Sequence, residues 1–563
     1  MTQTELLGAV TKWQYDADSR VTRVTLPDPD GAGTDPRLAT TNYAYDFLGR
    51  LTKETGATPT SGGSATSRPV TTYRYDSASR LISQTDPVLA TTKWTRDKLG
   101  RVVATTDPLG RISTASYDAG SQLVAVTDPL GNRTQFVYDA DGRQTRVILP
   151  DPDGTGPLLS PTRQTSYDNL GRTIQTTDER GGQTQFTYDL ANNLTSLRDP
   201  GGNSTTWAYD PLDRQTSETN ALGASKSWSY NARGELTSQT DRNGRVTNWA
   251  YDGLGRLVTE TWLTGTTADN TLSYTWDTAS RLSTATDQFS KYTYTYLATG
   301  EVATVSNFGT AGAPRVDLTN TYDLLGRRTK VAASVEGTAD FQNDYLYSLR
   351  GEITQVIQQQ QTTTRTVTPK RINFTYNLAG ERTSITRAAN VTGTQVVAKT
   401  TATYDLAGRL TEWKHVRNSA GTQINRYTWS YDALGRPVMQ TSVDGTSTCQ
   451  YDQSSQVIAA THTGQVSENY QYDSNGNRTN TGTSTGTNNR LLSDDKYDYQ
   501  YDADSRVTRV TLPDPDGAGT DPAPQQTLDY DRAGRLIEWK HVRNSTGTEI
   551  NRSTWSYDAL GRP

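Results

Sequence analysis

The chain has 563 residues, a formal net charge of -5 and a single cysteine, Cys449. This balance offers no basic surface for nucleic acid or anionic lipid, and one cysteine excludes an intramolecular disulfide framework. A hydrophobic content of 33% is low for a thick two-layer core, while 31 Tyr and 11 Trp argue against disorder. No apolar run approaches a membrane span and the start carries no signal-peptide pattern, so we expect no membrane insertion.

One six-residue pattern, Tyr-Asp-x-x-Gly-Arg, recurs from residue 15 to residue 562 in 23 copies. The spacings run from 20 to 30 residues, and 21 is the commonest. We therefore expect one continuous array over residues 1–563, with no separate toxin or protease domain. The lead residues of the copies are Tyr15, Tyr45, Tyr75, Arg96, Tyr117, Tyr138, Tyr167, Tyr188, Tyr209, Tyr230, Tyr251, Trp276, Tyr296, Tyr322, Tyr347, Tyr376, Tyr404, Tyr431, Tyr451, Tyr472, Tyr501, Tyr530 and Tyr557.

Each copy is typical of a β-hairpin. Around Tyr138, aromatic and polar residues alternate with the period of a strand, and residues 139–142 (DADG) then fit a type I turn. A second strand follows, and a second turn such as DPLG at 107–110 or 128–131 leads into the next copy. Two strands and two turns account for 21 residues. The sequence thus predicts an all-β, antiparallel hairpin ribbon.

Charged residues covary within the turns. Nineteen copies have Asp after the lead residue, and the other four (Asn231, Leu297, Ser348 and Asn377) are the four with Glu in place of Arg, at Glu235, Glu301, Glu352 and Glu381. Asp attracts Arg and repels Glu, so this pattern predicts that the two positions are close. The alternative is that the Glu copies are recent duplicates of one another, although their flanking residues differ. We expect turn pairs at Asp46 and Arg50, Asp252 and Arg256, Asp323 and Arg327, and Asp432 and Arg436.

The residues with chemical potential favour structural roles. His415 and His541 lie in two copies of EWKHVRNS, which a catalytic histidine would not need, and His462 stands alone. Cys449 takes a position that is usually aromatic, and GTSTG at 482–486 lacks the helix signal of a nucleophile elbow. Asp28, Asp30 and Asp35, copied at Asp514, Asp516 and Asp521, are weak calcium candidates, since their interleaved prolines fit plain turns better. We expect no catalysis, no bound metal and no cofactor.

Three tryptophans, Trp207, Trp228 and Trp249, recur at intervals of 21 residues. We expect them to stack as a ladder along the ribbon. The plain interpretation is packing on the sheet, and the alternative is a platform for glycan or peptide.

Because the pattern Tyr-Asp-x-x-Gly-Arg is repeated so often, the chain resembles the YD-repeat, or Rhs-repeat, family over residues 4–563. This family includes bacterial toxin shells, the cocoons of insecticidal toxin complexes and teneurin ectodomains. The resemblance implies a ribbon that spirals into a hollow shell or tube, with encapsulated cargo or surface adhesion as its use. The DPLG segments at 107–110 and 128–131 lack the following Leu of the family's self-cleaving core, so the resemblance does not extend to a protease or a toxin.

Strand spacing sets the scale. Each hairpin adds about 9.6 Å, so 23 copies make a ribbon about 220 Å long, which is about 70 Å across as one ring and narrower as several spiral turns. Residues 1–14 match the second half of a repeat and residues 554–563 the first half, and joining them gives a spacing of 21. We therefore expect end-to-end strand addition between copies, or further repeats of a longer chain; coincidence is the third option.

From the residues and the resemblance we expect a non-enzymatic shell, tube or scaffold segment of a secreted or cell-surface protein. Its partners would be copies of itself or further repeats, an encapsulated cargo and, in one interpretation, a glycan. The alternative function is surface adhesion through the aromatic ladder. We expect no nucleic-acid partner.

Overall fold

The computed structural model describes residues 2–4, 10–26, 40–57, 68–154, 156, 158–242, 244–310, 312–362, 367–417, 421–486, 489–494, 496–501, 506–512, 524–530, 536–542 and 549–554. These residues form antiparallel strands joined by turns and contain no α-helix. Within them, no helix has the length and apolar character needed to cross a bilayer. The expectation of an all-β hairpin ribbon is confirmed.

The strands of the first part of the ribbon are mostly five or six residues long. They are β1 (Thr2–Thr4), β2 (Val10–Tyr15), β3 (Val21–Thr25), β4 (Thr40–Tyr45), β5 (Leu51–Thr55), β6 (Val70–Tyr75), β7 (Leu81–Thr85), β8 (Thr91–Arg96), β9 (Val102–Thr106), β10 (Ile112–Tyr117), β11 (Leu123–Thr127), β12 (Arg133–Tyr138), β13 (Gln144–Ile148), β14 (Thr162–Tyr167), β15 (Thr173–Thr177), β16 (Gln183–Tyr188), β17 (Leu194–Arg198), β18 (Ser204–Tyr209), β19 (Gln215–Thr219), β20 (Ser225–Tyr230), β21 (Leu236–Thr240) and β22 (Val246–Tyr251).

The middle part includes longer strands, of up to ten residues, which widen the ribbon. Its strands are β23 (Leu257–Thr264), β24 (Thr267–Trp276), β25 (Leu282–Thr286), β26 (Lys291–Tyr296), β27 (Val302–Ser306), β28 (Val316–Tyr322), β29 (Arg328–Val335), β30 (Thr338–Tyr347), β31 (Ile353–Gln360), β32 (Lys370–Tyr376), β33 (Arg382–Ala388), β34 (Val396–Tyr404), β35 (Leu410–Arg417), β36 (Thr422–Tyr431), β37 (Pro437–Ser442), β38 (Gly445–Tyr451), β39 (Val457–His462) and β40 (Glu468–Asn469).

Strands β1 to β40 belong to one 40-stranded sheet in which each strand pairs with the next along the chain. A second sheet of seven strands follows. It contains β41 (Ser484–Thr485), β42 (Leu491–Ser493), β43 (Asp498–Tyr501), β44 (Val507–Thr511), β45 (Gln525–Tyr530), β46 (Leu536–Val542) and β47 (Glu549–Thr554). The ladder is therefore interrupted between Asn469 and Ser484, where the sequence is rich in Asn, Thr and Gly.

A bulge recurs beside the first turn of hairpin after hairpin. In β18, Ala208 pairs with Ser217, but Tyr209 pairs with Gln215, so one residue of the second strand is skipped. The same shift precedes Tyr230 and Tyr251 in their own hairpins. Bulges bend a strand and increase its twist. Repeated once per hairpin, they explain why this long sheet curves instead of lying flat.

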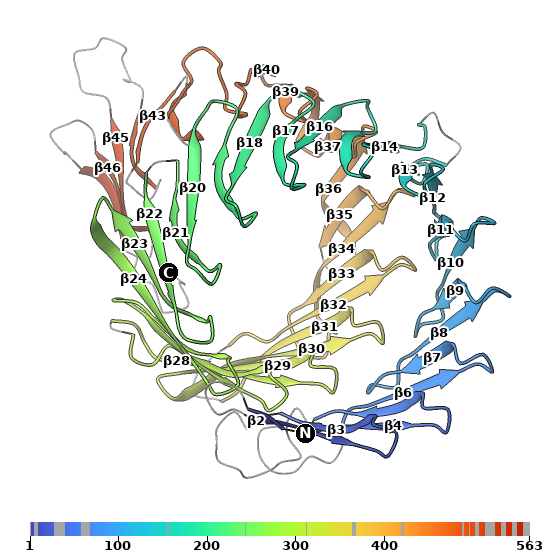
Figure 1. Cartoon of the computed structure of the whole chain (residues 1–563). Helices are drawn as coiled ribbons and strands as arrows, with labels where there is room; N and C mark the ends of the chain where they lie inside the picture. The colour runs from blue at the N-terminus through green and yellow to red at the C-terminus, as the bar shows by residue number, and fades with distance from the viewer. Residues whose placement is uncertain are drawn as a thin grey trace.

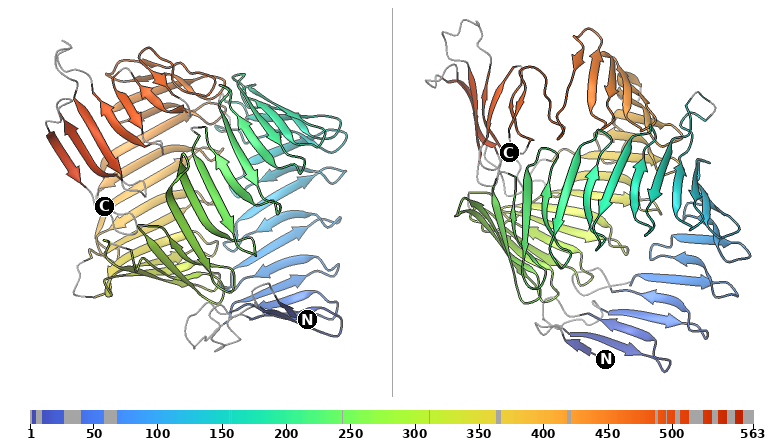
Figure 2. Two further views of the ribbon diagram at one scale, coloured as in Figure 1. Left: turned by 60° about the vertical axis from the view of Figure 1, so that its left-hand side comes forward. Right: turned by 45° about the horizontal axis from the view of Figure 1, so that its top comes forward.

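The curvature winds the sheet into a spiral, and the yellow to orange strands return beside the blue to teal ones (Figure 1). Two further views show the same arrangement (Figure 2). Contacts between successive turns of the spiral join residues that are 241 to 267 positions apart in the chain. About 22 strands separate such partners, so one turn measures about 105 Å around and about 34 Å across. The sequence left two sizes open, one ring about 70 Å across or a narrower spiral of several turns, and the structure is the narrower spiral.

Successive spiral turns meet at their edges, and we call this line of contact the seam. Its best-buried member is Arg111, whose side chain is only 6% exposed. This guanidinium pairs with Asp107 of its own turn at 2.9 Å and with Glu352 at 3.1 Å. It also donates to the backbone carbonyl of Asn377 at 2.8 Å. Arg350 lies 3.4 Å from the Asp107 carboxylate, so the seam holds a cluster of four charges here.

The seam continues from this cluster toward the C-terminal side of both layers. Leu406 donates its backbone N–H to the carbonyl of Pro152 at 3.2 Å. Farther along, Arg180 Nη1 lies 3.5 Å from Asp432 Oδ2. In each case the second β-turn of a repeat in the earlier layer of the spiral meets the first β-turn of a repeat in the later layer. The two edges of the ribbon are therefore complementary.

Few hydrophobic side chains are buried among the described residues, and most of these are small. Several are alanines: Ala90, Ala125, Ala333, Ala388 and Ala402. In a single curved sheet, a side chain is covered only by the side chains of neighbouring strands and not by a second layer. The stabilising contacts must therefore repeat along the ribbon instead of gathering in one core.

The first prediction concerns the seam. Replacing Arg111 by Met removes four charge-assisted contacts from a buried site, to Asp107, Glu352 and the carbonyls of residues 377 and 378, and leaves Glu352 with fewer partners. We expect the free energy of unfolding to fall by about 2 kcal/mol in urea titrations. The matched control is Arg180→Met, whose ion pair is longer and whose side chain is 49% exposed, and we expect a loss below about 1 kcal/mol there. Equal losses for the two variants would contradict the assignment of Arg111 as the main seam contact.

Candidate functional site

In most repeats the first turn is closed by its own aspartate. In the copy at Asp252, Oδ1 accepts hydrogen bonds from the backbone N–H groups of Leu254 and Arg256 at 2.8 and 3.0 Å. Its Oδ2 accepts from Arg256 Nε at 2.7 Å. Gly255 follows with a φ of 78°, a conformation that side chains other than glycine rarely adopt. The turn motif thus fixes the Asp, the Gly and the Arg together.

The structure brings together all four expected turn pairs. The nitrogen–oxygen distances are 2.7 Å for Asp46 and Arg50, 2.6 Å for Asp252 and Arg256, 2.6 Å for Asp323 and Arg327, and 2.7 Å for Asp432 and Arg436.

The electrostatics favour the ionised aspartate. Partial burial of Asp252 opposes ionisation, but hydrogen bonds from the side chain and backbone of Arg256 outweigh it and hold the pKa of that carboxyl below its ordinary value. At Asp76, the backbone hydrogen bond from Arg80 is the main cause of a lowered pKa.

The arginine also reaches the next repeat. Arg172 Nη1 donates to the backbone carbonyl of Asp189 at 3.1 Å, and its guanidinium lies 4.8 Å from the centre of the Tyr188 ring. The same stacking of a first-turn arginine on the next lead residue recurs along the ribbon. The pairs are Arg20 and Tyr45, Arg50 and Tyr75, Arg101 and Tyr117, Arg143 and Tyr167, Arg214 and Tyr230, Arg256 and Trp276, Arg281 and Tyr296, Arg327 and Tyr347, Arg409 and Tyr431, and Arg436 and Tyr451.

The lead tyrosine bonds backward to the previous repeat. Tyr209 donates its hydroxyl hydrogen to the carbonyl of Leu194 at 2.9 Å, and Tyr230 donates to that of Gln215 at 2.8 Å. In these and most other described copies the acceptor is the first residue after the Arg position of the preceding turn, whereas Tyr501, beyond the break in the ribbon, donates to the carbonyl of Leu491 instead. Two lead residues are not tyrosine, yet Arg96 and Trp276 donate through nitrogen to the equivalent carbonyls. The lead position therefore requires a hydrogen-bond donor as well as a large side chain.

The four Glu copies replace the ion pair by a hydrogen bond. Asn231 Nδ2 donates to Glu235 at 2.6 Å, and Asn377 Nδ2 donates to Glu381 at the same distance. In the third copy the Ser348 hydroxyl donates to Glu352, also at 2.6 Å. In the fourth, Leu297 has no polar side chain and Thr299 Oγ1 bonds to Glu301 instead. Each Glu thus finds a neutral donor where an Asp would repel it.

Serine replaces the turn glycine in several copies, and sequence reasoning gave it no role. Ser280 has a φ of 59°, which is strained for a residue with a Cβ. Its hydroxyl accepts a hydrogen bond from Arg256 Nη1 of the previous repeat at 3.2 Å. Ser79 and Ser455 accept from Arg50 and Arg436 in the same way. The signal was present in the sequence as a recurring Ser at the Gly position.

The three expected ladder tryptophans lie on alternate strands, β18, β20 and β22. Such strands are about 9.6 Å apart, too far for ring stacking, and no ring contact joins these three. The strand between carries polar partners: Trp207 donates to Glu218 at 3.2 Å and Trp228 to Gln239 at 3.0 Å. The expectation of direct stacking is corrected to a row in which aromatic and polar side chains alternate.

The remaining candidates are built into the sheet. His415 lies with Nδ1 2.8 Å from Thr400 Oγ1 and Nε2 2.8 Å from Trp413 Nε1, and burial followed by the nearby Arg387 lowers its pKa. His462 contacts the Ser447 hydroxyl at 2.7 Å across the ladder. His541 is 6.1 Å from the Trp539 ring centre.

Cys449 is half-buried in β38. Ser484 of the GTSTG segment pairs with Ser493 in the second sheet. Among the residues that the structure describes, no group of three or more His, Cys, Asp or Glu side chains is arranged to hold a metal. The weak calcium candidates Asp28, Asp30 and Asp35, and their copies, lie outside the described residues.

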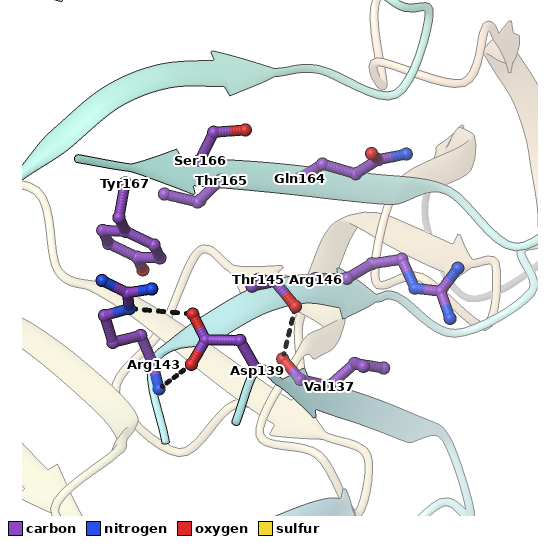
Figure 3. Close-up of a pocket in the computed structure, with 9 residues that line it drawn as sticks. All are labelled: Val137, Asp139, Arg143, Thr145, Arg146, Gln164, Thr165, Ser166 and Tyr167. Carbon is purple, nitrogen blue, oxygen red and sulfur yellow. Dashed lines mark hydrogen bonds and ion pairs between the residues drawn. The ribbon is translucent and has the colours of Figure 1, made fainter. Parts of the chain in front are cut away.

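A shallow hollow of about 380 Å³ lies over the first turn that contains Asp139 and Arg143, between β12, β13 and β14. Figure 3 shows Asp139 bonded twice to Arg143, with the Tyr167 ring beside that guanidinium. Thr145 also bonds to the carbonyl of Val137. The Asp139, Arg143 and Thr145 side chains in this hollow bond to other residues of its wall. Their arrangement is that of a structural joint between repeats.

Comparison with known proteins gives a family and a fold. Segments 75–112, 117–154, 167–204, 190–225, 230–261 and 404–447 match the RHS Repeat family. No curated protein sequence matches the chain.

Similar solved structures include the Photorhabdus luminescens Tc holotoxin pore with a mutation in TccC3, at a TM-score of 0.64 and 14% identity. A TcdB2-TccC3-Cdc42 structure and a TcdB2-TccC3-TEV structure each give a TM-score of 0.56 at 14% identity. All three alignments cover 97% of this chain and 31% of the other, so this chain spans about a third of the length of these structures.

The second prediction tests the covariation of the turn charges. Arg256→Glu alone places two carboxylates in one turn, and we expect a clear fall in the thermal unfolding midpoint. Adding Asp252→Asn recreates the Asn231 and Glu235 arrangement, and we expect it to restore most of the loss. Asp252→Asn alone is the control. If the double variant unfolds no later than Arg256→Glu, the two positions are not coupled.

The third prediction concerns alkaline pH. Burial is the main cause of raised pKa values at Tyr209, Tyr251 and Tyr376. A raised pKa means that folding favours the neutral phenol. This stabilisation is fully present below the ordinary tyrosine pKa of about 10 and is lost as the pH rises through the raised values.

We therefore expect the thermal unfolding midpoint to fall steeply above about pH 10, together with the rise of phenolate absorbance. A midpoint that stays constant while the tyrosines ionise would contradict the role of their hydroxyl donors.

Proposed function

Because this chain belongs to the RHS-repeat family, we propose that it is a wall segment of a hollow protein shell and that its role is structural, not enzymatic. The observation that carries the proposal is the size of the spiral. One turn contains about 22 strands, whereas a closed barrel of about eight strands is already filled by its own side chains and one of 16 to 18 leaves a channel. A wall this wide encloses space.

The scarcity of large buried side chains supports the same proposal. The interior-sized residues of an ordinary core are replaced by contacts that run along the wall: turn pairs, arginine–tyrosine stacking and tyrosine-to-carbonyl bonds. Such a wall needs no filling to be stable. Its polar faces are suited to enclosing or scaffolding another chain without binding it through one deep apolar pocket.

The similar structures point to the kind of assembly. One is a Tc holotoxin pore with a mutation in TccC3 and another is a TcdB2-TccC3-Cdc42 structure, and this chain covers about a third of the length of each. We propose that residues 1–563 are one array of repeats, that further repeats or copies of the chain complete the enclosure, and that the cargo is a separate polypeptide. An extracellular or cell-surface location follows from this use. The proposal involves no cofactor, no nucleic acid and no membrane insertion.

One observation favours a second function, surface adhesion. Trp207, Trp228 and Trp249 repeat on one face at two-strand spacing, and each is partly exposed. Alternating aromatic and polar side chains are also found where proteins bind sugars or peptides, because a ring offers an apolar face beside hydrogen-bonding groups.

The fourth prediction separates the two functions. Small-angle X-ray scattering of the whole chain is expected to give a distance distribution with the depleted centre of a curved, hollow wall. A filled globular profile would contradict the shell. On a glycan array, binding that is lost in Trp228→Ala and kept in Trp429→Ala, which carries a similar indole-to-glutamine bond in β36, would favour adhesion instead.

A further inference from the structure

The tips of the first turns carry leucine or phenylalanine in many repeats. Within the seam these tips are partly covered by the neighbouring spiral turn. Leu406 donates its backbone N–H to Pro152, and its side chain lies close to Gly154. The carbonyl of Leu378 accepts from Arg111 at 3.2 Å. Leu378 and Leu406 are 51% and 45% exposed. The seam therefore shows what normally covers such a tip: a second turn of an adjacent layer.

The same tips on the first spiral turn lack this cover. Phe47, at the position equivalent to Leu378 and Leu406, is 93% exposed. One position later in the turn, Leu170 and Leu212 are 73% and 70% exposed, whereas Leu434 in the seam is half-buried. Because the motif positions are equal, the difference comes from the missing neighbour and not from the local turn.

These exposed tips form a continuous row. Leu170, Leu190 and Leu212 stand on the first turns of three consecutive repeats, whose lead residues are Tyr167, Tyr188 and Tyr209. They are therefore spaced at about 9.6 Å along the edge. We call this row the leucine edge. A contiguous run of exposed leucines is typical of a surface that another protein covers.

The opposite edge of the later spiral turn is exposed as well. It consists of second turns, which are the elements that cover leucine tips in the seam. Val443, between β37 and β38, is 61% exposed, and Val466, between β39 and β40, is 90% exposed. We call these two residues the valine edge. The chain thus presents both halves of its own seam, unpaired, at opposite ends of the spiral.

We propose that the leucine edge of one copy of this chain docks on the valine edge of a second copy. The contact repeats between molecules the edge-to-edge packing that the seam makes within one molecule. Since the two edges differ, the interface is heterologous and adds copies in one direction along the spiral axis. The proposal concerns the edges only and does not depend on the shell being hollow.

The test uses two variants of the whole chain in sedimentation velocity. One is Leu170→Glu with Leu190→Glu and Leu212→Glu, and the other is Val443→Glu with Val466→Glu. We expect the wild type to form larger species as its concentration rises, and each variant alone to remain monomeric. Mixed in equal amounts, the variants each retain one intact edge, and we expect them to form a dimer that grows no further.

Leu346→Glu is the control, because Leu346 is 53% exposed but lies in β30 away from the turn tips; it is expected to associate like the wild type. Unchanged circular dichroism confirms that each variant is folded. A wild type that stays monomeric at its highest soluble concentration overturns the proposal. A mixture that stays monomeric does the same, and loss of association in the leucine-edge variant alone would assign the partner to a second leucine edge.

Discussion

In most repeats the first turn carries an arginine that links three groups, and the ribbon depends on this link. Its guanidinium pairs with the aspartate of its own turn, donates to the backbone of the next turn and lies against the next lead ring, as Arg172 does with Asp168, Asp189 and Tyr188. The tyrosine hydroxyl completes the joint by bonding backward. A single-layer sheet cannot stabilise itself through a core, so each repeat is held by its neighbours. Each joint needs groups from two neighbouring repeats, so the Tyr-Asp-x-x-Gly-Arg motif has to recur from one repeat to the next.

Much of this joint could be predicted from the sequence. The period, the alternation of aromatic residues and the turn signals at 107–110 and 139–142 specify a hairpin ribbon, because they are local features. The coincidence of Glu235 with Asn231 and of Glu381 with Asn377 indicated a close pair. The two positions are only four residues apart, in one turn, so two carboxylates there would repel each other. These inferences required no knowledge of how repeats are stacked.

The contacts between repeats and between spiral turns could not be predicted in this way. The bond from Tyr209 to Leu194 depends on the register of two neighbouring hairpins, and tryptophan stacking was wrongly expected because the intervening strand was ignored. The meeting of Arg111 with Glu352 depends on the curvature summed over about 22 strands. A small error in the twist of each strand, accumulated over that distance, would bring a different turn beside Arg111.

The seam has a consequence for how such a chain can lengthen. Adding one hairpin between Arg111 and Glu352 would leave every local joint intact, since each repeat fits its neighbours. It would nevertheless slide one layer past the other by one unit, so that Arg111 would face a different turn and the cluster of four charges would separate. The contacts along the ribbon therefore tolerate the duplication of a hairpin, but the contacts across the seam do not. The buried Arg111 side chain requires a fixed number of hairpins in one revolution of the spiral.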